Sequence, residues 1–329
     1  LTRSLFLLPE EVSHRVALEI LKVAFHTRIL NFFKSEDTSK KVKVFNLDFS
    51  NRIGLAAGMD KNGDYIDALS SLGFGLLEIG TITPKAQSGN TKPRLFRLTG
   101  DNSLINRMGF NNKGVDYLVS RIKTRKSDVV LGVSIGKNAL TPIEKSVEDY
   151  LFCFKKVYPY ADYLVANISS PNTKNLRKLE TKKYFSNLLT VLKKEQSKQS
   201  ASFGYKPLLV KLSPDIDEEN QEELAKEILD KQIDGLVCFN TTNSHKHPLE
   251  GGLSGQELFE LSTKKMADFK SYLGKSIPII ASGGVMGKEH FKAKIEAGAD
   301  LIQIYTGMIY EGPGIVNEMV KYSQKIEAS

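Results

Sequence analysis

The feature that most constrains the fold of this sequence is a regular alternation of short apolar runs and amphipathic segments after residue 50. Eight runs are typical of buried strands: Ile53–Ala57, Leu76–Ile79, Val129–Ile135, Tyr163–Asn167, Leu208–Leu212, Gly235–Phe239, Ile277–Ala281 and Leu301–Ile304. Helical periodicity follows most of them, at about 62–71, 113–123, 143–158, 182–197, 218–230, 256–272, 287–297 and 315–327. Eight strand–helix units predict an α/β fold, a closed (β/α)8 TIM barrel.

The alternative is a doubly wound open sheet. Such a sheet commonly carries a Gly-x-Gly-x-x-Gly turn after its first strand, and this sequence has none there. The pair of glycines at Gly73 and Gly75 precedes a strand instead. We therefore favour the barrel.

Composition excludes several classes of protein. The chain has 329 residues, 41% hydrophobic and 26% charged, so it can bury a full core, which excludes a disordered or disulfide-stapled chain. The net charge of +8 is dispersed, so no nucleic-acid partner is expected, and attraction to anionic lipid is a weaker alternative.

Cys153 and Cys238 lie far apart and do not have the spacing typical of metal ligands, which fits a reducing compartment. No apolar run is long enough to span a bilayer. The sequence starts at Leu1 rather than Met, so the absence of a targeting segment carries no weight.

Residues 1–35 differ from the rest and form a predicted helical extension. Pro9, Glu10 and Glu11 are typical of a helix start. Two apolar rows follow: Val12, Val16, Ile20 and Val23 in one, and Leu18, Leu21 and Phe25, headed by His14, in the other. Further apolar residues flank them: Leu5, Phe6, Leu7 and Leu8 before, and Ile29, Leu30, Phe32 and Phe33 after. Physics alone favours a helical cap packed on the barrel over an amphipathic element that touches a membrane.

A polar linker, Ser35 to Lys41, separates this extension from the barrel, which we place at 42–329. The segment from Thr83 to Phe110, after the second strand, is too long for a plain connection. Long insertions of this kind usually form a lid or wall of an active site.

Polar and glycine residues follow nearly every predicted strand, where a barrel of this kind carries its chemistry. Gly283 and Gly284 follow the seventh strand, and Tyr305, Thr306 and Gly307 follow the eighth. Loops at these two positions commonly bind phosphate. A tight turn alone would explain the glycines, but the paired location favours a phosphate-bearing cofactor across the barrel mouth.

Two lysines and a set of asparagines lie at or near the same strand ends. Lys61 and Lys211 either pair with Asp60, Glu78 or Asp215, or face an anionic ligand or a reduced cofactor. A single Asn is usually a turn residue, but five converging amides suit a planar heterocycle with imide groups. The set is Asn106, Asn111, Asn167, Asn172 and Asn240. Ser170, beside Pro171, is by itself best interpreted as a cap.

The histidines show no spacing typical of metal ligands, and we expect no metal site. They are His14, His26, His245, His247 and His290. His245 and His247 lie in a predicted loop, and we expect both to be solvated.

Several ordered motifs resemble the dihydroorotate dehydrogenases of class 2, which are membrane-associated and use quinone. The motifs begin at Leu55 (LAAGMDKNG), Pro93 (PRLFRL), Ile105 (INRMGFNN), Asn167 (NISSPNT), Asn240 (NTT), Gly251 (GGLSG) and Gln303 (QIYTG). The resemblance covers nearly the whole chain from about residue 5. It implies oxidation of dihydroorotate to orotate in pyrimidine (UMP) biosynthesis, with FMN as cofactor.

The resemblance also implies residue roles. FMN would contact Ala57, Gly58, Lys61, Thr81, Ser134, Asn167, Lys211, Phe239, Gly255, Gly284, Tyr305 and Thr306. Substrate would be held by Lys61, Asn106, Arg107, Met108, Gly109, Phe110, Asn167, Asn172, Asn240 and Thr241. Ser170 would be the base, shielded by Phe110 and hydrogen-bonded to Thr173.

The class assignment rests on Ser170, because the related soluble enzymes carry a cysteine as base in this loop, and on the helical extension. In this family the extension leads a quinone, ubiquinone or menaquinone, to the flavin, with His14 and Arg97 near its head group. The resemblance thus shifts our preference to a monotopic membrane element. We expect a monomer on a bacterial cytoplasmic membrane, with the mitochondrial inner membrane as the alternative.

Three positions depart from the family. Ser134 stands where an Asn often contacts FMN, Phe239 stands where a Thr is usual, and the loop from Asn243 to Glu250 is short. We expect altered flavin packing as a result.

Three other functions are possible for a barrel of this kind. A soluble class 1 enzyme using fumarate or NAD is opposed by Ser170 and the extension. A tRNA dihydrouridine synthase would need a catalytic cysteine and an RNA-binding extension. A non-catalytic phosphate-binding barrel would leave Ser170, Lys61 and the asparagines without a shared purpose.

Overall fold

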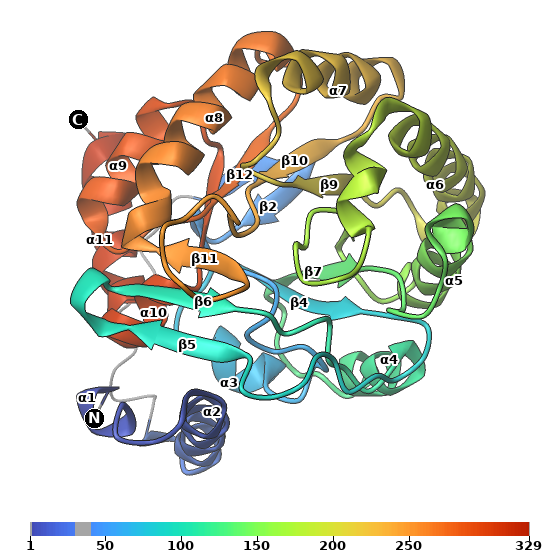
Figure 1. The fold of residues 1–329 in the computed structure, drawn as a ribbon. Helices are drawn as coiled ribbons and strands as arrows, with labels where there is room; N and C mark the ends of the chain where they lie inside the picture. The colour runs from blue at the N-terminus through green and yellow to red at the C-terminus, as the bar shows by residue number, and fades with distance from the viewer. Residues whose placement is uncertain (1, 30–40, 329) are drawn as a thin grey trace.

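The computed structural model describes residues 2–29 and 41–328, and its centre is a closed barrel of eight parallel strands (Figure 1). In chain order around the barrel they are β3 (Ile53–Leu55), β4 (Leu76–Ile82), β7 (Val130–Ile135), β8 (Tyr163–Asn167), β9 (Leu208–Leu212), β10 (Gly235–Cys238), β12 (Ile279–Ser282) and β13 (Leu301–Ile304). β13 pairs with β3 and closes the ring. The predicted barrel and its eight strands are confirmed, with ends that differ by a few residues.

Helices surround this barrel and cover its strands (Figure 1). They are α3 (Ile66–Ser70), α4 (Val115–Lys123), α5 (Ser146–Val157), α6 (Lys182–Phe203), α7 (Glu218–Asp230), α8 (Phe259–Leu273), α9 (Lys288–Glu296), α10 (Thr306–Glu311) and α11 (Gly314–Ala328). The helix predicted over 62–71 is shorter than expected, because Asp60 accepts hydrogen bonds from the four backbone N–H groups of residues 62–65. That pattern holds a tight loop in place of the first helical turn.

A β-hairpin that was not predicted from the sequence closes the bottom of the barrel. Strands β1 (Val42–Val44) and β2 (Leu47–Phe49) pair antiparallel through a turn in which Phe45 and Asn46 both have positive φ. Val44 and Phe49 pack against barrel residues such as Tyr163 and Val237. The end of the barrel opposite the strand carboxyl ends is therefore filled with apolar side chains.

The insertion after β4 forms a small sheet over the opposite end. Its strands β5 (Leu95–Leu98) and β6 (Ser103–Asn106) pair antiparallel, and β6 also pairs with β11 (Gly252–Gly255) from the loop after β10. Figure 1 shows this sheet lying across the barrel mouth. The predicted wall is therefore present, and it consists of two insertions rather than one.

Two helices precede the barrel and lie beside this sheet, α1 (Thr2–Leu5) and α2 (Glu10–His26). The predicted helical extension thus corresponds to α1 and α2. Leu30, Phe32, Phe33 and the linker through residue 40 lie outside the described residues. The described part of the chain holds no helix that is both long and apolar enough to cross a membrane.

Candidate active site

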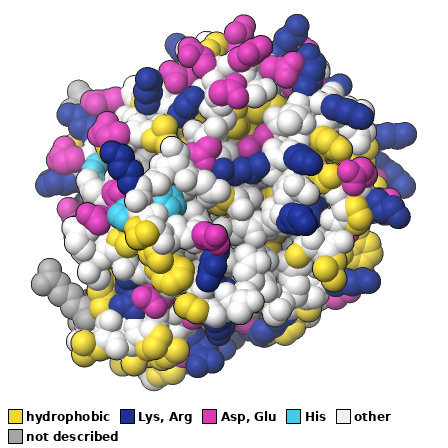
Figure 2. All heavy atoms as spheres, in the orientation of Figure 1, with side chains coloured by type: hydrophobic (Ala, Val, Ile, Leu, Met, Phe, Trp, Pro, Cys, Tyr) yellow, Lys and Arg dark blue, Asp and Glu magenta, His cyan; other side chains and the backbone are white. Residues whose placement is uncertain are grey.

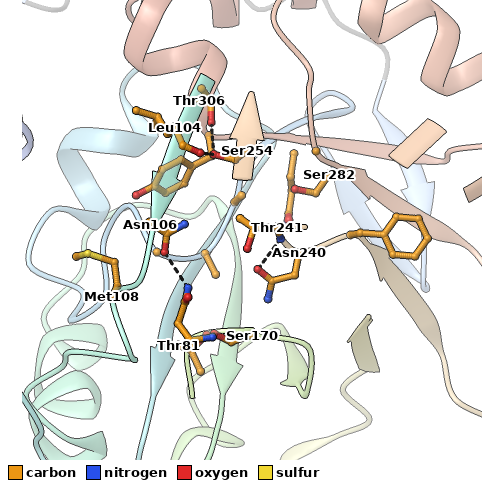
Figure 3. Close-up of a pocket in the computed structure, with 18 of the residues that line it drawn as sticks. Thr81, Leu104, Asn106, Met108, Ser170, Asn240, Thr241, Ser254, Ser282 and Thr306 are labelled. Carbon is orange, nitrogen blue, oxygen red and sulfur yellow. Dashed lines mark hydrogen bonds between the residues drawn. The ribbon is translucent and has the colours of Figure 1, made fainter. Parts of the chain in front are cut away.

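The barrel mouth holds a cavity between the strand ends, the sheet β5–β6–β11 and α2. It has about 1230 Å³ not occupied by protein atoms, including the solvent at its opening. The side chains that point into it come from opposite sides of the barrel (Figure 3). Predicted residues that line it are His14, Ala57, Gly58, Lys61, Thr81, Asn106, Met108, Gly109, Phe110, Asn167, Ser170, Asn172, Lys211, Phe239, Asn240, Thr241, Gly255, Gly284, Tyr305 and Thr306.

A network of amides crosses this cavity. The Asn172 Nδ2 donates to the Asn106 Oδ1 at 3.2 Å, and the Asn240 Nδ2 donates to the Asn167 Oδ1 at the same distance. The Asn167 Nδ2 donates in turn to the Thr81 Oγ1 at 2.7 Å. Four of the five predicted asparagines are thus brought together, and each amide offers both donors and acceptors to a flat polar ring. The fifth, Asn111, does not line the cavity.

Ser170 lies beside this network, on the loop that follows β8. Its side chain is only 6% exposed, and its Oγ accepts a hydrogen bond from the Asn172 backbone N at 3.3 Å. That bond closes a local turn and does not cap a helix, because the next helix begins only at Leu176, so the cap predicted from sequence is not formed. Ser170 lines the cavity instead. Phe110, from the β6 side, lines the cavity as well, whereas Thr173 does not. The Thr173 Oγ1 is buried with no hydrogen-bond partner among the described residues, so the expected hydrogen bond between Thr173 and Ser170 is not present.

Arg177 fixes the loop that carries Ser170, and the sequence offered no clear sign of this. Its Nε donates to the Ser169 carbonyl at 3.1 Å and its Nη2 donates to the Thr241 carbonyl at 2.9 Å. Its Nη1 pairs with Asp215 at 2.7 Å. One guanidinium therefore ties together the loops after β8, β9 and β10, which limits how far the Ser170 hydroxyl can move.

Lys61 is partly buried on the wall nearest α2. Its Nζ donates to the Gly58 carbonyl at 2.8 Å, and it pairs with no carboxylate of the described residues. The neighbouring Asp60 is taken up by backbone N–H groups, so the predicted alternative of a Lys61–Asp60 salt bridge is wrong. Burial lowers the pKa of Lys61 to about 8, and the Arg94 charge adds to this. An anionic ligand would restore the missing counter-charge.

Lys211 enters the cavity from β9 and is also buried. Burial lowers the pKa of Lys211 and raises the pKa of Glu78, while the attraction between the two groups opposes both shifts. The Glu78 Oε2 accepts a hydrogen bond from the Gln303 Nε2 at 2.7 Å, and no direct ion pair joins Glu78 to Lys211. Lys211 therefore faces the cavity with only a remote counter-charge.

Three glycines form a close-packed rim on the side of β11, β12 and β13. Gly255, Gly283 and Gly284 all have positive φ. A Cβ at Gly284 would lie 2.4 Å from the Phe259 Cα, and one at Gly255 would lie 2.5 Å from the Asn102 carbonyl oxygen. Backbone atoms therefore line this rim, because any side chain there would clash. A rim of exposed backbone is typical of phosphate-binding sites. The Thr306 and Ser254 hydroxyls meet at the same rim, 2.9 Å apart (Figure 3).

The first turns of α2 also line the cavity, through Glu11 and His14. Glu11 pairs with Arg94 at 2.5 Å and with Lys92 at 2.9 Å. Burial lowers the pKa of His14 to about 4, and the Lys61 charge lowers it further. His14 is therefore neutral at physiological pH. Glu11 was missed as a site residue because an acid at a helix start is already explained by the helix dipole.

Several predicted residues lie outside the cavity. Arg97 donates to the Phe6 carbonyl at 2.7 Å and to the Leu8 carbonyl, so it holds the connection between α1 and α2. Arg107 is partly exposed, donates to the Pro93 carbonyl and pairs with Glu250 at 3.5 Å. Ser134 is buried behind Thr81, with the two hydroxyls 2.9 Å apart. Phe239 borders the cavity, but its ring packs against Phe269 of α8.

His245 and His247 are both partly exposed, but each ring also contacts a protein group, so they are not free in solvent as the sequence predicted. The His247 Nε2 contacts Glu257 at 2.8 Å, and the His245 Nε2 contacts the Gly251 carbonyl at 3.0 Å. Asp101 lies close enough that one ligand atom from each of Asp101, His247 and Glu257 lies within 4.8 Å of the others. His247 and Glu257 already partner each other, so this contact needs no ion to explain it.

Comparisons with known proteins agree on one family. The sequence model described as dihydroorotate dehydrogenase matches residues 39–326. A protein named dihydroorotate dehydrogenase (quinone) from Acinetobacter baylyi is 47% identical, covering 96% of each chain. One of the same name from Coxiella burnetii is 45% identical, covering 97% of this chain and 94% of its own. The crystal structure of the Eimeria tenella enzyme with ferulenol superposes with a TM-score of 0.86 at 33% identity, covering 96% of this chain and 91% of its own.

Proposed function

Because this chain belongs to the dihydroorotate dehydrogenase family, we infer that it oxidises dihydroorotate to orotate in pyrimidine biosynthesis, with a quinone as the final electron acceptor. The observation that carries this function is the composition of one cavity. It joins a buried serine, a lysine that pairs with no carboxylate of the described residues, four amides and the start of α2. The amides suit the pyrimidine ring, the lysine suits its carboxylate, and α2 offers a way in for a second, apolar substrate.

We propose FMN as the flavin. The rim of Gly255, Gly284 and Thr306 fits a phosphate, because backbone there approaches without intervening side chains. Ala57, Gly58, Thr81, Lys211 and Tyr305 line the neighbouring wall and would hold the ring system. The buried Lys211 ammonium, with only Glu78 as a remote counter-charge, suits a ring that gains negative charge. When bound, the flavin accepts a hydride from dihydroorotate and passes the electrons to quinone.

The remaining chemistry belongs to side chains of the chain. Lys61 would bind the substrate carboxylate, while Asn106, Asn172 and Asn240 would orient the ring by hydrogen bonds. Ser170 would then remove a proton from the ring carbon next to the one that loses hydride. Phe110 would keep bulk water away from this step. A serine is a weak base, so the proton must leave by a relay. The buried Thr173 hydroxyl, which has no hydrogen-bond partner among the described residues, is the proposed first member of that relay.

We propose that quinone reaches this cavity along α1 and α2 from a membrane surface. Four exposed apolar side chains of this region support the proposal, Leu7, Ile20, Val23 and Ile29, between 42% and 89% exposed. Figure 2 shows hydrophobic side chains gathered over α1 and α2. His14 would face the quinone head group, with Arg97 holding the entry in shape. The bacterial origin of the relatives favours the cytoplasmic membrane, and one chain supplies the complete cavity, so we propose a monomer.

An anaerobic visible spectrum of the purified protein tests both half-reactions. Dihydroorotate is added first, and a short-chain quinone is added second. We expect the flavin band to bleach with the first addition and to return with the second. Recovery with fumarate instead of quinone would overturn the quinone assignment. A band that dihydroorotate leaves unchanged would overturn the proposed substrate.

A further inference from the structure

Two described lysines are buried outside the cavity, Lys137 and Lys294, and Lys294 lies directly behind the glycine rim of the cavity. Lys294 lies on α9, and its side chain is 0% exposed. Its Nζ donates to the Ser262 Oγ of α8 at 2.6 Å and lies 5.5 Å from the centre of the Phe259 ring. A fully buried lysine is rare unless it is paired. The burial of Lys294 therefore needs an explanation, whereas the exposed lysines of α9 need none.

No carboxylate among the described residues forms an ion pair with Lys294. The charged and titratable groups that act on it are Glu260 of α8, Cys238 at the end of β10 and His290 of α9. Burial raises the pKa of Cys238 far above its usual range, so that group is a neutral thiol. Burial lowers the pKa of Lys294 to about 7, only partly offset by the attraction of Cys238 and Glu260. An ammonium at this place thus has no paired counter-ion within residues 2–29 and 41–328.

Ser262 links this lysine to the rim. The Ser262 Oγ lies 2.9 Å from the Gly283 carbonyl and 3.0 Å from the Phe259 carbonyl, both of which accept from it. A hydroxyl has one proton to donate. When Lys294 donates to the oxygen of Ser262, that proton is directed away from Lys294 and toward these two carbonyls. Both carbonyls belong to the segments that meet at Gly284, where a Cβ would lie 2.6 Å from the Phe259 N.

We propose that Lys294 is a positioning residue for the phosphate of the cofactor. Through Ser262 it fixes the turn of Gly283 and Gly284, and its ammonium places a positive charge two hydrogen bonds behind the rim. The bound phosphate is then the counter-ion that the described residues do not provide. This inference rests on the proposed flavin mononucleotide, and it adds a residue outside the cavity to the phosphate site.

The proposal predicts a pH dependence whose sign follows from the charge. A phosphate near Lys294 favours the ammonium form, so binding raises the pKa of Lys294 and takes up a proton. Affinity for FMN must therefore fall as pH rises above 7. The phosphate itself is a dianion throughout this range, since its second pKa is about 6. The pKa of His290 is lowered by burial and by Lys294, so His290 is neutral from pH 7 to 9.

The test is a titration of the full chain, freed of flavin, with FMN and separately with riboflavin, at pH 7 and pH 9. For the unaltered protein we expect FMN affinity to fall about tenfold between these pH values. In Lys294→Met we expect affinity about 30-fold weaker at pH 7 and nearly independent of pH. Riboflavin lacks the phosphate, so Lys294→Met should change its binding less than twofold, and any pH dependence that Lys61 or Lys211 causes would appear with riboflavin too.

Two further variants separate positioning from folding. Lys292→Met removes a half-exposed lysine from the same helix and should leave FMN affinity within twofold. Ser262→Ala removes the hydroxyl between Lys294 and the glycine turn but keeps the charge, so FMN affinity should fall about fivefold with its pH dependence intact.

Lys294→Met should also raise the melting temperature of the flavin-free chain by about 2–4 °C, because an unpaired buried charge is removed. A merely structural lysine would lower it.

Equal FMN affinity in Lys294→Met and the unaltered protein at pH 7 would overturn the proposal. An equal loss for FMN and riboflavin would overturn it as well. If Lys294→Met does not fold, Ser262→Ala is the deciding variant. Full FMN affinity in Ser262→Ala would show that Lys294 does not act on the phosphate site through Ser262. A protein that binds riboflavin but does not prefer FMN refutes the phosphate inference alone. A protein that binds neither refutes the proposed flavin, and this inference falls with it.

Discussion

The barrel mouth is held by many buried polar contacts, whereas the N-terminal helices are held by few contacts. At the mouth, buried polar groups partner one another, as Asn167 does with Thr81 and Asn240, at 2.7 and 3.2 Å. The helix α2 instead contacts the barrel through a few polar bonds, among them Glu11 to Arg94 and the Tyr65 hydroxyl to Glu19 at 2.6 Å. Only Leu18 of α2 is fully buried.

This difference corresponds to the two half-reactions we propose. Proton removal needs groups fixed to within a fraction of an ångström, and the cross-linked mouth supplies them. Quinone delivery needs an apolar surface that a membrane can cover, and α1 and α2 leave such a surface exposed. Changes at the mouth should therefore affect the reduction of flavin by substrate, and changes in α2 should affect its reoxidation by quinone.

The largest expected effect is that of Ser170→Ala, which removes the proposed base. We expect the rate of flavin reduction by dihydroorotate to fall about 10³-fold, the range typical of a lost general base. Flavin content and reoxidation by quinone should not change. Stopped-flow spectroscopy of each half-reaction measures both rates. Ser197→Ala, at an exposed position on α6, is the matched control. A loss of less than tenfold in Ser170→Ala would remove Ser170 from this role.

The second largest expected effect is on membrane binding by α2. Ile20→Ser with Val23→Ser removes two exposed apolar side chains from α2. Each should contribute about 1 kcal/mol to membrane binding, so the double variant should bind anionic lipid vesicles about 30-fold more weakly. Vesicle co-sedimentation measures this, and flavin reduction by dihydroorotate should be unchanged.

Leu140→Ser is the matched control for that variant, because Leu140 is 97% exposed in the loop after β7, away from α2. Equal weakening by Leu140→Ser would mean that apolar exposure in general, and not α2, determines vesicle binding.

The same two regions differ in how far the sequence predicted them. Barrel strands follow from local apolar periodicity, and the rule that chemistry lies at strand ends located Lys61 and Lys211. Ser170 received a role only from the family resemblance. The sheet over the mouth was missed because β6 pairs with β11, about 150 residues later, and no local signal records that pairing. The turn at Phe45 and Asn46 was missed because neither residue is the usual glycine of a tight hairpin.

Side-chain partners were harder to predict than backbone. Lys294 lies in a helix rich in charged residues, where a lysine is normally solvated, and only the packing of α8 against α9 buries it. Arg97 and Arg107 belong to family motifs, yet both bind carbonyl groups outside the cavity. Motif membership identifies the residues of a region, whereas the direction of a long side chain depends on tertiary contacts.

A smaller effect tests the contact between the two regions. Glu11→Gln keeps the size of the side chain but removes the charge that pairs with Arg94, which is only 7% exposed. A hydrogen bond to a charged group contributes about 1.5–3 kcal/mol, so α2 should dock less firmly. We expect reoxidation by quinone to slow about tenfold while flavin reduction changes less than threefold.

Glu10→Gln is the control for this variant. Glu10 lies in the same turn of α2, but its carboxylate is 4.0 Å from Arg97, a much longer contact than that of Glu11 with Arg94. If Glu11→Gln slowed both half-reactions equally, the mouth and α2 would form one unit rather than two.

The smallest effect is a pH dependence of substrate binding at the mouth. Burial lowers the pKa of Lys61 to about 8, so Lys61 is charged at pH 7 and mostly neutral at pH 9. A bound carboxylate favours the charged form, and affinity for orotate must therefore fall as pH rises through 8. We expect about a fivefold loss between pH 7 and pH 9, measured from the change in the flavin spectrum on titration with orotate. Lys61→Arg keeps its charge at pH 9 and should bind orotate with a flat pH profile, although more weakly because the guanidinium has a different shape. A flat profile in the unaltered protein would show that Lys61 does not bind the carboxylate, and the mouth would then need another cation, with Lys211 the nearest candidate.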